Sequence, residues 1–174
     1  MLERLWAGWR TTYVQGFAPE GGHVQGPGES LFTRILASGL PDEDTHIVHR
    51  GKHSFVILNA YPYSPGHVLV LPYREVADLE LLTADEEAEL WGNVRDAVAA
   101  IKRAYAPQGL NVGINLGAPA GGSVSQHLHV HVLPRWTGDT NFTVVTANTK
   151  VLSEPLEATA RRIREAWTTT RRHA

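Results

Sequence analysis

The sequence predicts an α+β fold, in which a mostly antiparallel sheet is covered by one long helix and flanked by terminal helices. Three observations support this prediction. Short β-rich runs joined by turns fill residues 46–74, a long amphipathic segment begins at Thr83, and alternating apolar residues return after Pro107. The 174 residues suit a single domain over 1–174, with its core at about 44–146.

The first part of the sheet is predicted to be an antiparallel meander. A short helix in SLFTRILASGL (30–40) precedes it, and Gly51 and the turn PYSPG (62–66) separate its strands. Its three strands are the runs HIVHR (46–50), SFVILNAY (54–61) and HVLVLPYR (67–74).

The longest helix is predicted to begin after Thr83. Glu86 lies three residues beyond Thr83, which is the spacing of a capping box, and Pro107 and Gly109 end the helix. A length of about 22 residues, or roughly 33 Å, is enough to cross one face of a sheet. Apolar residues recur in it at helical spacing: Leu90, Val94, Val98, Ile101 and Tyr105.

Further strands are predicted after this helix. They are LNVGINL (110–116), QHLHVHVLP (126–134) and NFTVVT (141–146), and the glycine-rich loop GAPAGGS (117–123) follows the first of them. The sheet is therefore expected to be completed by the second half of the chain.

Both ends of the chain are predicted to be helical. Residues 2–14 fit a short amphipathic helix, and Ser153 can cap a last helix that has Pro155 in its first turn. The apolar face of that last helix consists of Leu156, Ile163 and Trp167.

Composition excludes several classes of protein. The chain has no cysteine, which excludes disulfides, thiolate catalysis and cysteine-based zinc sites and suits a reducing compartment. A net charge of −2 does not favour a nucleic-acid partner. No stretch approaches the roughly 20 apolar residues of a membrane span. We therefore expect a cytoplasmic protein that binds neither nucleic acid nor membrane.

The run QHLHVHVLP carries three of the nine histidines at alternate positions. Because side chains alternate across a strand, His127, His129 and His131 are expected on one face. The residues between and after them are apolar and are expected in the core: Leu128, Val130 and Val132.

Three kinds of chemistry fit these histidines. One metal ion bound by all three is disfavoured, because the backbones of His127 and His131 lie roughly 13 Å apart on a straight strand, whereas zinc needs each nitrogen at about 2.0–2.1 Å. Hydrogen-bonded histidines lining a polar groove are the second interpretation. The third is attack on phosphorus by the neutral imidazole of His129, with the glycine-rich loop and Ser123 donating to phosphate oxygens.

The histidine run resembles a known family. HLHVHVL (127–133) matches the His-x-His-x-His-x-x signature, with hydrophobic x, of the histidine triad (HIT) superfamily of nucleotide hydrolases and transferases. SPGHVLVLPYREV (64–76) resembles its Pro-Gly-His strand, and SFVILNAYPYSPGH (54–67) resembles the nucleoside pocket of the fragile-histidine-triad branch. Over residues 2–152, the motifs LWAGWR, YPYSPGH, NVGINLG, GGS and PRWTGDTNF look like those of the bacterial diadenosine tetraphosphate phosphorylases in this superfamily.

The resemblance implies a HIT-like fold and roles for individual residues. His129 matches the nucleophile, His127, His131 and His67 match its supporting histidines, and Asn59 matches a residue that binds ribose hydroxyls. Other matches are Asn115, Gly122 and Ser123 at phosphate-binding positions, Trp136 as an aromatic near the site, and Phe55 and Leu58, which either bound the base pocket or are plain core.

The sequence also departs from the family pattern. Many relatives bind structural zinc with a Cys-x-x-Cys motif and histidines, but here that place reads Ser30 to Thr33, and Glu75 replaces a histidine. We therefore expect no resident metal. The spacing from Asn115 to the triad is one residue longer than in the commonest branches, and Leu116 occupies the unshifted position, so the contact of Asn115 is left open.

The function implied is cleavage of diadenosine tetraphosphate with phosphate to ATP and ADP through a nucleotidyl-histidine. One alternative is a hydrolase of dinucleoside polyphosphates or nucleoside phosphoramidates, and another is a non-catalytic nucleotide-binding regulator. No cofactor is required beyond a divalent cation that could accompany the nucleotide. The resemblance also implies a homodimer or higher homo-oligomer, with Trp6, Trp9 and Trp167 as candidate interface residues.

Overall fold

The computed structural model describes residues 28–121, 124–139 and 154–167 of the chain. Its strands are β1 (Ile47–Arg50), β2 (Ser54–Leu58), β3 (Val68–Pro72), β4 (Gly109–Ile114) and β5 (Val130–Arg135). Its helices are α2 (Leu31–Ala37), α3 (Asp42–Thr45), α4 (Ala84–Tyr105) and α6 (Leu156–Ala166), with 3-10 turns η1 (Leu79–Leu81) and η2 (Ala118–Ala120).

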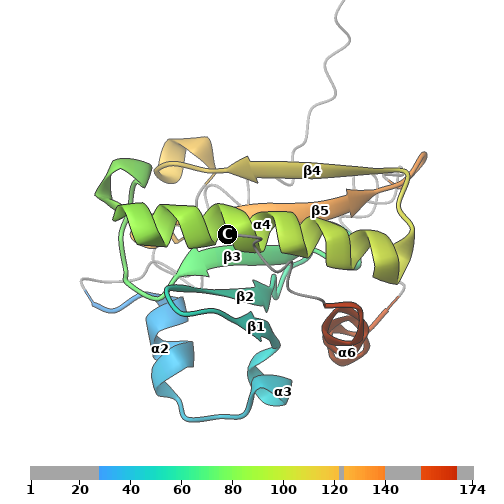
Figure 1. The fold of residues 1–174 in the computed structure, drawn as a ribbon, viewed down its shortest axis with the longest axis horizontal. Helices are drawn as coiled ribbons and strands as arrows, with labels where there is room; N and C mark the ends of the chain where they lie inside the picture. The colour runs from blue at the N-terminus through green and yellow to red at the C-terminus, as the bar shows by residue number, and fades with distance from the viewer. Residues whose placement is uncertain (1–27, 122–123, 140–153, 168–174) are drawn as a thin grey trace, which may run out of the picture.

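The five strands form one antiparallel sheet in the order β1-β2-β3-β5-β4. Figure 1 shows α4 lying across one face of this sheet, with α6 near its β1 edge. The predicted α+β fold is therefore confirmed, and so is the meander of the first three strands. The sequence did not predict that β5 lies between β3 and β4. After β3 the chain passes through α4 and forms β4, and β5 then lies between these two strands.

Helix α4 begins and ends close to the predicted residues. The capping box is formed, since Thr83 N donates to the Glu86 carboxylate at 2.8 Å and Glu86 N donates to the Thr83 hydroxyl at 3.3 Å. Ala106 ends the helix in a left-handed conformation. One turn along, the Glu89 carboxylate accepts from the backbone N–H of His53 and of Ser54, which ties the helix to the turn between β1 and β2.

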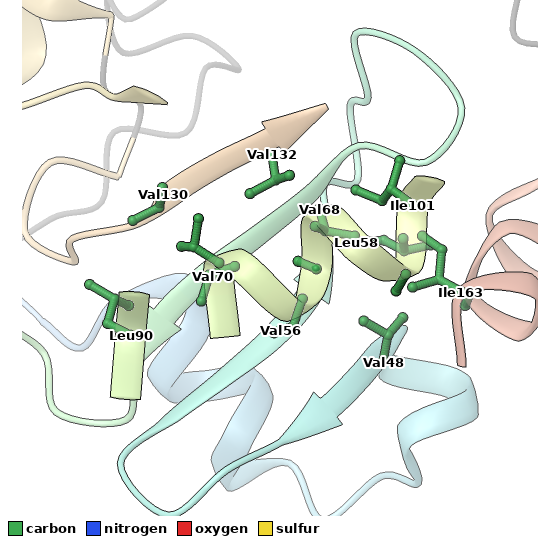
Figure 2. Packing of buried hydrophobic residues seen from close by; sticks show 14 of the residues in the cluster. Val48, Val56, Leu58, Val68, Val70, Leu90, Ile101, Val130, Val132 and Ile163 are labelled. Atoms are coloured by element: carbon green, nitrogen blue, oxygen red, sulfur yellow. The ribbon is translucent and has the colours of Figure 1, made fainter. Parts of the chain in front are cut away.

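Two apolar clusters occupy the two faces of the sheet. The cluster between the sheet, α4 and α6, called the helix-side cluster, includes Val56, Leu58, Val130, Leu90 and Ile163 (Figure 2). The opposite cluster, called the histidine-side cluster, consists of Phe32, Ile47, Phe55, Ile57, Leu69, Leu71 and Val124. Alternate residues of β2 and β3 enter alternate clusters, as the period of a strand requires.

Three predicted boundaries were wrong. The strand predicted at 54–61 ends at Leu58. The strand predicted at 126–134 begins only at Val130, because Leu128 N donates to the carbonyl of Val76 instead of joining the ladder. The last helix begins at Leu156 with Pro155 as its extended N-cap, so Pro155 precedes the first turn rather than lying in it.

Several predictions concern residues outside the described ranges: the helix at 2–14 with Trp6 and Trp9, the strand at 141–146 and the cap at Ser153. Trp167 is described, and its ring stacks on His49 at 4.6 Å and packs against the helix-side cluster. Among the described residues, no helix has both the length and the apolar character needed to cross a membrane.

Candidate active site

The site lies on the face of the sheet opposite α4, where β3 and β5 are neighbours. His67 directly precedes β3, and His131 in β5 pairs with Leu69. Gly66 has a φ of 86°, and a Cβ there would lie 3.1 Å from the Tyr105 ring, so only glycine fits this turn without strain. The Pro-Gly-His turn therefore fixes His67 beside the histidine run.

His129 is held in the form that a nucleophile needs. Its Nδ1 lies 2.8 Å from the backbone oxygen of His127, and its side chain is almost fully buried. A carbonyl oxygen only accepts hydrogen bonds, so Nδ1 carries the proton. In the neutral ring, Nε2 then keeps its lone pair and can attack an electrophile.

His127 is anchored at both ring nitrogens. Its Nε2 lies 2.8 Å from the carbonyl oxygen of Pro72, so this nitrogen carries a proton and donates. Its Nδ1 lies 2.7 Å from the hydroxyl of Ser30 and, in the neutral ring, accepts from it. The ring is fully buried, and Phe32 of α2 packs edge-on against it at 5.5 Å.

His67 and His131 form a directed pair. Tyr63 N donates to Nδ1 of His67 at 3.1 Å, so a neutral His67 carries its proton on Nε2. That nitrogen lies 3.0 Å from Nδ1 of His131 and donates to it. A neutral His131 must then be protonated on Nε2, which is buried and lacks a hydrogen-bond partner among the described residues. The pair therefore ends in a buried N–H that has no acceptor among the described residues.

Burial favours the neutral form of the three triad histidines, His127, His129 and His131, near pH 7. Desolvation lowers the pKa of His129, although its hydrogen bond to the His127 carbonyl opposes this, and desolvation likewise lowers the pKa of His127. Burial, together with the nearby His129, lowers the pKa of His131 to about 4. A neutral imidazole at the centre of the site is the state that can act as a nucleophile.

Two amide side chains lie close to these histidines. Asn59 follows β2, with its Nδ2 3.3 Å from Nδ1 of His67 and its Oδ1 accepting from Tyr61 N. Asn115 is half-buried directly after β4, and continuing the pairing of Ile114 with Val130 sets its backbone opposite His129. The same alternation puts Asn115, and not Leu116, on the histidine side.

The other predicted site residues that the structure describes make no hydrogen bond or ring contact with the four histidines. Phe55 is fully buried in the histidine-side cluster and stacks on Tyr73 at 5.2 Å, whereas Leu58 belongs to the helix-side cluster. The Trp136 ring lies 6.4 Å from Tyr105, where α4 ends, and its backbone N–H donates to Asp139. Gly122 and Ser123 lie outside the described residues.

Sequence reasoning missed three contributors: the Ser30 hydroxyl, the Pro72 carbonyl and the Tyr63 N–H, which set the ring protons of His127 and His67. Two of them are backbone groups, which no side-chain pattern marks. The sequence did draw attention to Ser30, because this residue occupies the position of a family metal ligand. That position does not indicate that its side chain contacts His127.

The residues at the family's zinc position do not fit that metal here. Ser30, Thr33 and Glu75 are hydrogen-bonded to one another, and Ser30 is bonded to His127. Hydroxyl groups are poor substitutes for the thiolates of a structural zinc site. Among the described residues, no group of three or more His, Cys, Asp or Glu side chains is arranged to hold a metal ion.

Comparisons with known proteins identify the family of the chain. The family model for the HIT domain matches residues 41–138. The chain is 43% identical over 171 residues to the AP-4-A phosphorylase of Mycobacterium tuberculosis, covering 95% of this chain and 85% of that protein. It is 38% identical over 95 residues to the asymmetrical bis(5'-nucleosyl)-tetraphosphatase of Schizosaccharomyces pombe, covering 55% and 52%.

A histidine triad nucleotide-binding protein from Sulfolobus tokodaii has a similar solved structure, with a TM-score of 0.62, 31% identity, and coverage of 78% of this chain and 89% of that one. The family match spans more than half of the chain, and it includes all four histidines of the site. The resemblance inferred from the motifs is thereby confirmed, and the chain belongs to the HIT family.

Proposed function

We propose that this protein is a phosphorylase that cleaves diadenosine tetraphosphate with inorganic phosphate to give ATP and ADP. The observation that carries the proposal is the buried His129, whose Nδ1 proton is bound by the His127 carbonyl and whose Nε2 lone pair is available. The choice of reaction is supported by the 43% identity to a protein named AP-4-A phosphorylase.

In the first step, Nε2 of His129 attacks the α-phosphorus of one adenosine. A P–N bond forms, the P–O bond to the rest of the polyphosphate breaks, and ATP leaves with that electron pair. The adenylylated ring is positively charged, and its Nδ1–H remains bonded to the His127 carbonyl, which stabilises the charge.

In the second step, an oxygen of inorganic phosphate attacks the same phosphorus atom. The P–N bond breaks, ADP is formed, and His129 returns to its neutral state. The Nε2–H of His131 is suited to donate to a phosphoryl oxygen during both steps, and Asn59 beside His67 is suited to bind ribose hydroxyls. No resident cofactor takes part in either step, although a divalent cation can accompany the polyphosphate.

The test is to incubate the protein with diadenosine tetraphosphate in the presence and absence of phosphate and to separate the nucleotides. ADP and ATP formed only with phosphate support the phosphorylase. AMP formed under both conditions identifies a hydrolase that uses water. Binding without any turnover identifies a non-catalytic nucleotide-binding protein. Adding a chelator to the same assay tests the role of a divalent cation.

We also infer that the protein is a homodimer or larger homo-oligomer in the cytoplasm. β4 is an edge strand of the described sheet, and Val112 on it is 45% exposed while Leu116 just beyond it is 41% exposed. An apolar edge of this kind favours pairing with a second copy. Light scattering after size exclusion should give a molar mass that is a multiple of 19.1 kDa. Val112→Lys should reduce this mass. A monomeric wild-type protein contradicts the inference.

A further inference from the structure

Two buried side chains, Ser30 and His127, and two half-buried ones, Thr33 and Glu75, form a polar cluster behind the histidine site, away from the reacting atoms. The Ser30 hydroxyl lies 2.7 Å from Nδ1 of His127 and 3.0 Å from the Thr33 hydroxyl. The Glu75 carboxylate accepts from Ser30 N at 2.8 Å and from the Thr33 hydroxyl at 2.7 Å. Ser30 and His127 are both fully buried, so neither can exchange these partners for water.

The proton of each group in this cluster can be assigned. The Glu75 carboxylate only accepts, so the Thr33 proton is directed to it. The Pro72 carbonyl only accepts, so His127 carries its proton on Nε2 and leaves Nδ1 as an acceptor. The one proton of Ser30 completes the set by pointing at Nδ1 of His127. Hydrogen bonds to the Glu75 carboxylate outweigh its burial and hold its pKa below the ordinary value, which keeps it an acceptor.

We propose that Ser30 is a positioning residue for this site: its N–H is bound by Glu75 and its hydroxyl oxygen accepts from Thr33 N, so its hydroxyl proton points at Nδ1 of His127. Together with the Pro72 carbonyl it restrains the Nε2-protonated ring and so orients the backbone carbonyl that binds His129. The link is short, because the oxygen that accepts from Nδ1 of His129 belongs to His127 itself. A ring bonded at both nitrogens restrains the backbone that carries it. The effect on turnover rests on the proposed function, whereas the effect on the hydrogen bonds of the two rings does not.

Helix α2 offers a matched control. Ser38 ends the same helix, and its exposed hydroxyl donates to the carbonyl of Ile35. Ser38→Ala therefore removes a serine hydroxyl from α2 without touching a histidine. Ser30→Ala removes the donor to His127, and Ser30→Thr keeps a hydroxyl at that position, which is also an acceptable N-cap.

The first measurement is the tautomer of each ring in the full chain labelled with ¹⁵N at histidine, read from the long-range proton–nitrogen couplings in NMR spectra without substrate. We expect His127 to be protonated on Nε2 and His129 on Nδ1 in the wild type. Ser30→Ala should remove the donor to Nδ1 of His127 and shift that nitrogen and the His129 nitrogens, while the Pro72 carbonyl keeps the proton of His127 on Nε2. Ser30→Thr and Ser38→Ala should retain the wild-type pattern.

The second measurement is steady-state turnover of diadenosine tetraphosphate with phosphate. Ser30→Ala should lower kcat by about 10- to 100-fold with KM little changed, because the loss affects the orientation of the nucleophile rather than substrate binding. Ser30→Thr should restore most of kcat. A merely structural role would lower the melting temperature without this split or rescue.

Three results would overturn the proposal. One is an Nδ1-protonated His127 in the wild-type protein, which needs no variant and so does not depend on how Ser30→Ala folds. Another is a Ser30→Ala spectrum in which both rings keep their wild-type nitrogen shifts. The third is equal loss of kcat in Ser30→Ala and Ser38→Ala. If the wild type does not turn over the dinucleotide, the proposed function fails, and the NMR result still decides the role of Ser30.

Discussion

The two faces of the sheet are built from the same strands but are stabilised by different interactions. The helix-side cluster is filled by aliphatic residues that α4 and α6 cover, and its contacts are non-directional. The histidine side combines apolar residues with histidine rings that form directional hydrogen bonds. One example is the bond from the His129 ring to the His127 carbonyl. Substitutions on the helix side should therefore change the free energy of unfolding, whereas those on the histidine side should change chemistry.

The largest expected effect is on the histidine side. His129→Ala removes the attacking nitrogen, so turnover of diadenosine tetraphosphate should fall by at least about 10⁴-fold. Circular dichroism should show that the secondary structure is retained. A variant with activity within tenfold of the wild type would remove His129 from the mechanism. It would also show that the histidine side does not differ from the helix side in its effect on turnover.

Leu90→Ala tests the helix side. Leu90 is fully buried in the helix-side cluster, so its truncation should lower the free energy of unfolding by about 2–5 kcal/mol in urea denaturation. Leu81→Ala is the matched control, because Leu81 is 51% exposed and the change should be within about 0.5 kcal/mol. At a temperature where the protein is folded, kcat of Leu90→Ala should stay near the wild-type value; a large fall would show that the faces are coupled.

Acid should weaken the histidine side selectively. The pKa of His131 falls from 6.5 to about 4 on folding, so between these values the unfolded chain binds a proton that the folded chain does not. Stability is complete above pH 6.5 and decreases as the pH falls toward 4. The expected loss between pH 7 and pH 5 is about 1–2 kcal/mol for this group, discounted for its partial exposure.

This loss can be measured as the difference in thermal midpoint between pH 7 and pH 5. His131→Gln removes the titrating group while leaving an acceptor for His67, so the difference should be smaller in the variant. Equal differences in the two proteins would show that burial of His131 does not control its protonation.

The smallest expected effect is at the start of α4. Thr83→Ala removes the hydroxyl that accepts from Glu86 N, and stability should fall by about 0.5–2 kcal/mol without a change in kcat. Thr83→Ser keeps the cap and should be close to the wild type. A change in kcat for Thr83→Ala alone would show that the helix side influences the chemistry.

Much of the fold could be predicted because its signals are local. The Thr83–Glu86 capping box marks a helix start within four residues, and alternation at Leu128 and Val130 assigns side chains to faces. The shared face of the histidine run could also be predicted, because three histidines at alternate positions lie together on any extended segment.

The rest depends on contacts between residues that are distant in sequence. Ser30 lies 97 residues from His127, and no local pattern indicates that their side chains meet. The late start of β5 has the same origin, since the bond from Leu128 to Val76 diverts the chain from the ladder. Leu58 depends on a different signal: it is next to Asn59 in sequence, but the period of the strand turns its side chain into the helix-side cluster.

The insertion of β5 between β3 and β4 has a consequence for folding order. The meander can form from neighbouring segments, but His67 meets His131 only after a loop of 64 residues has closed. β4 is synthesised before β5 and has no partner in the described sheet until β5 arrives. A nascent chain that has formed its first three strands thus holds one histidine of the four, and the candidate site is assembled only when β5 pairs with β3.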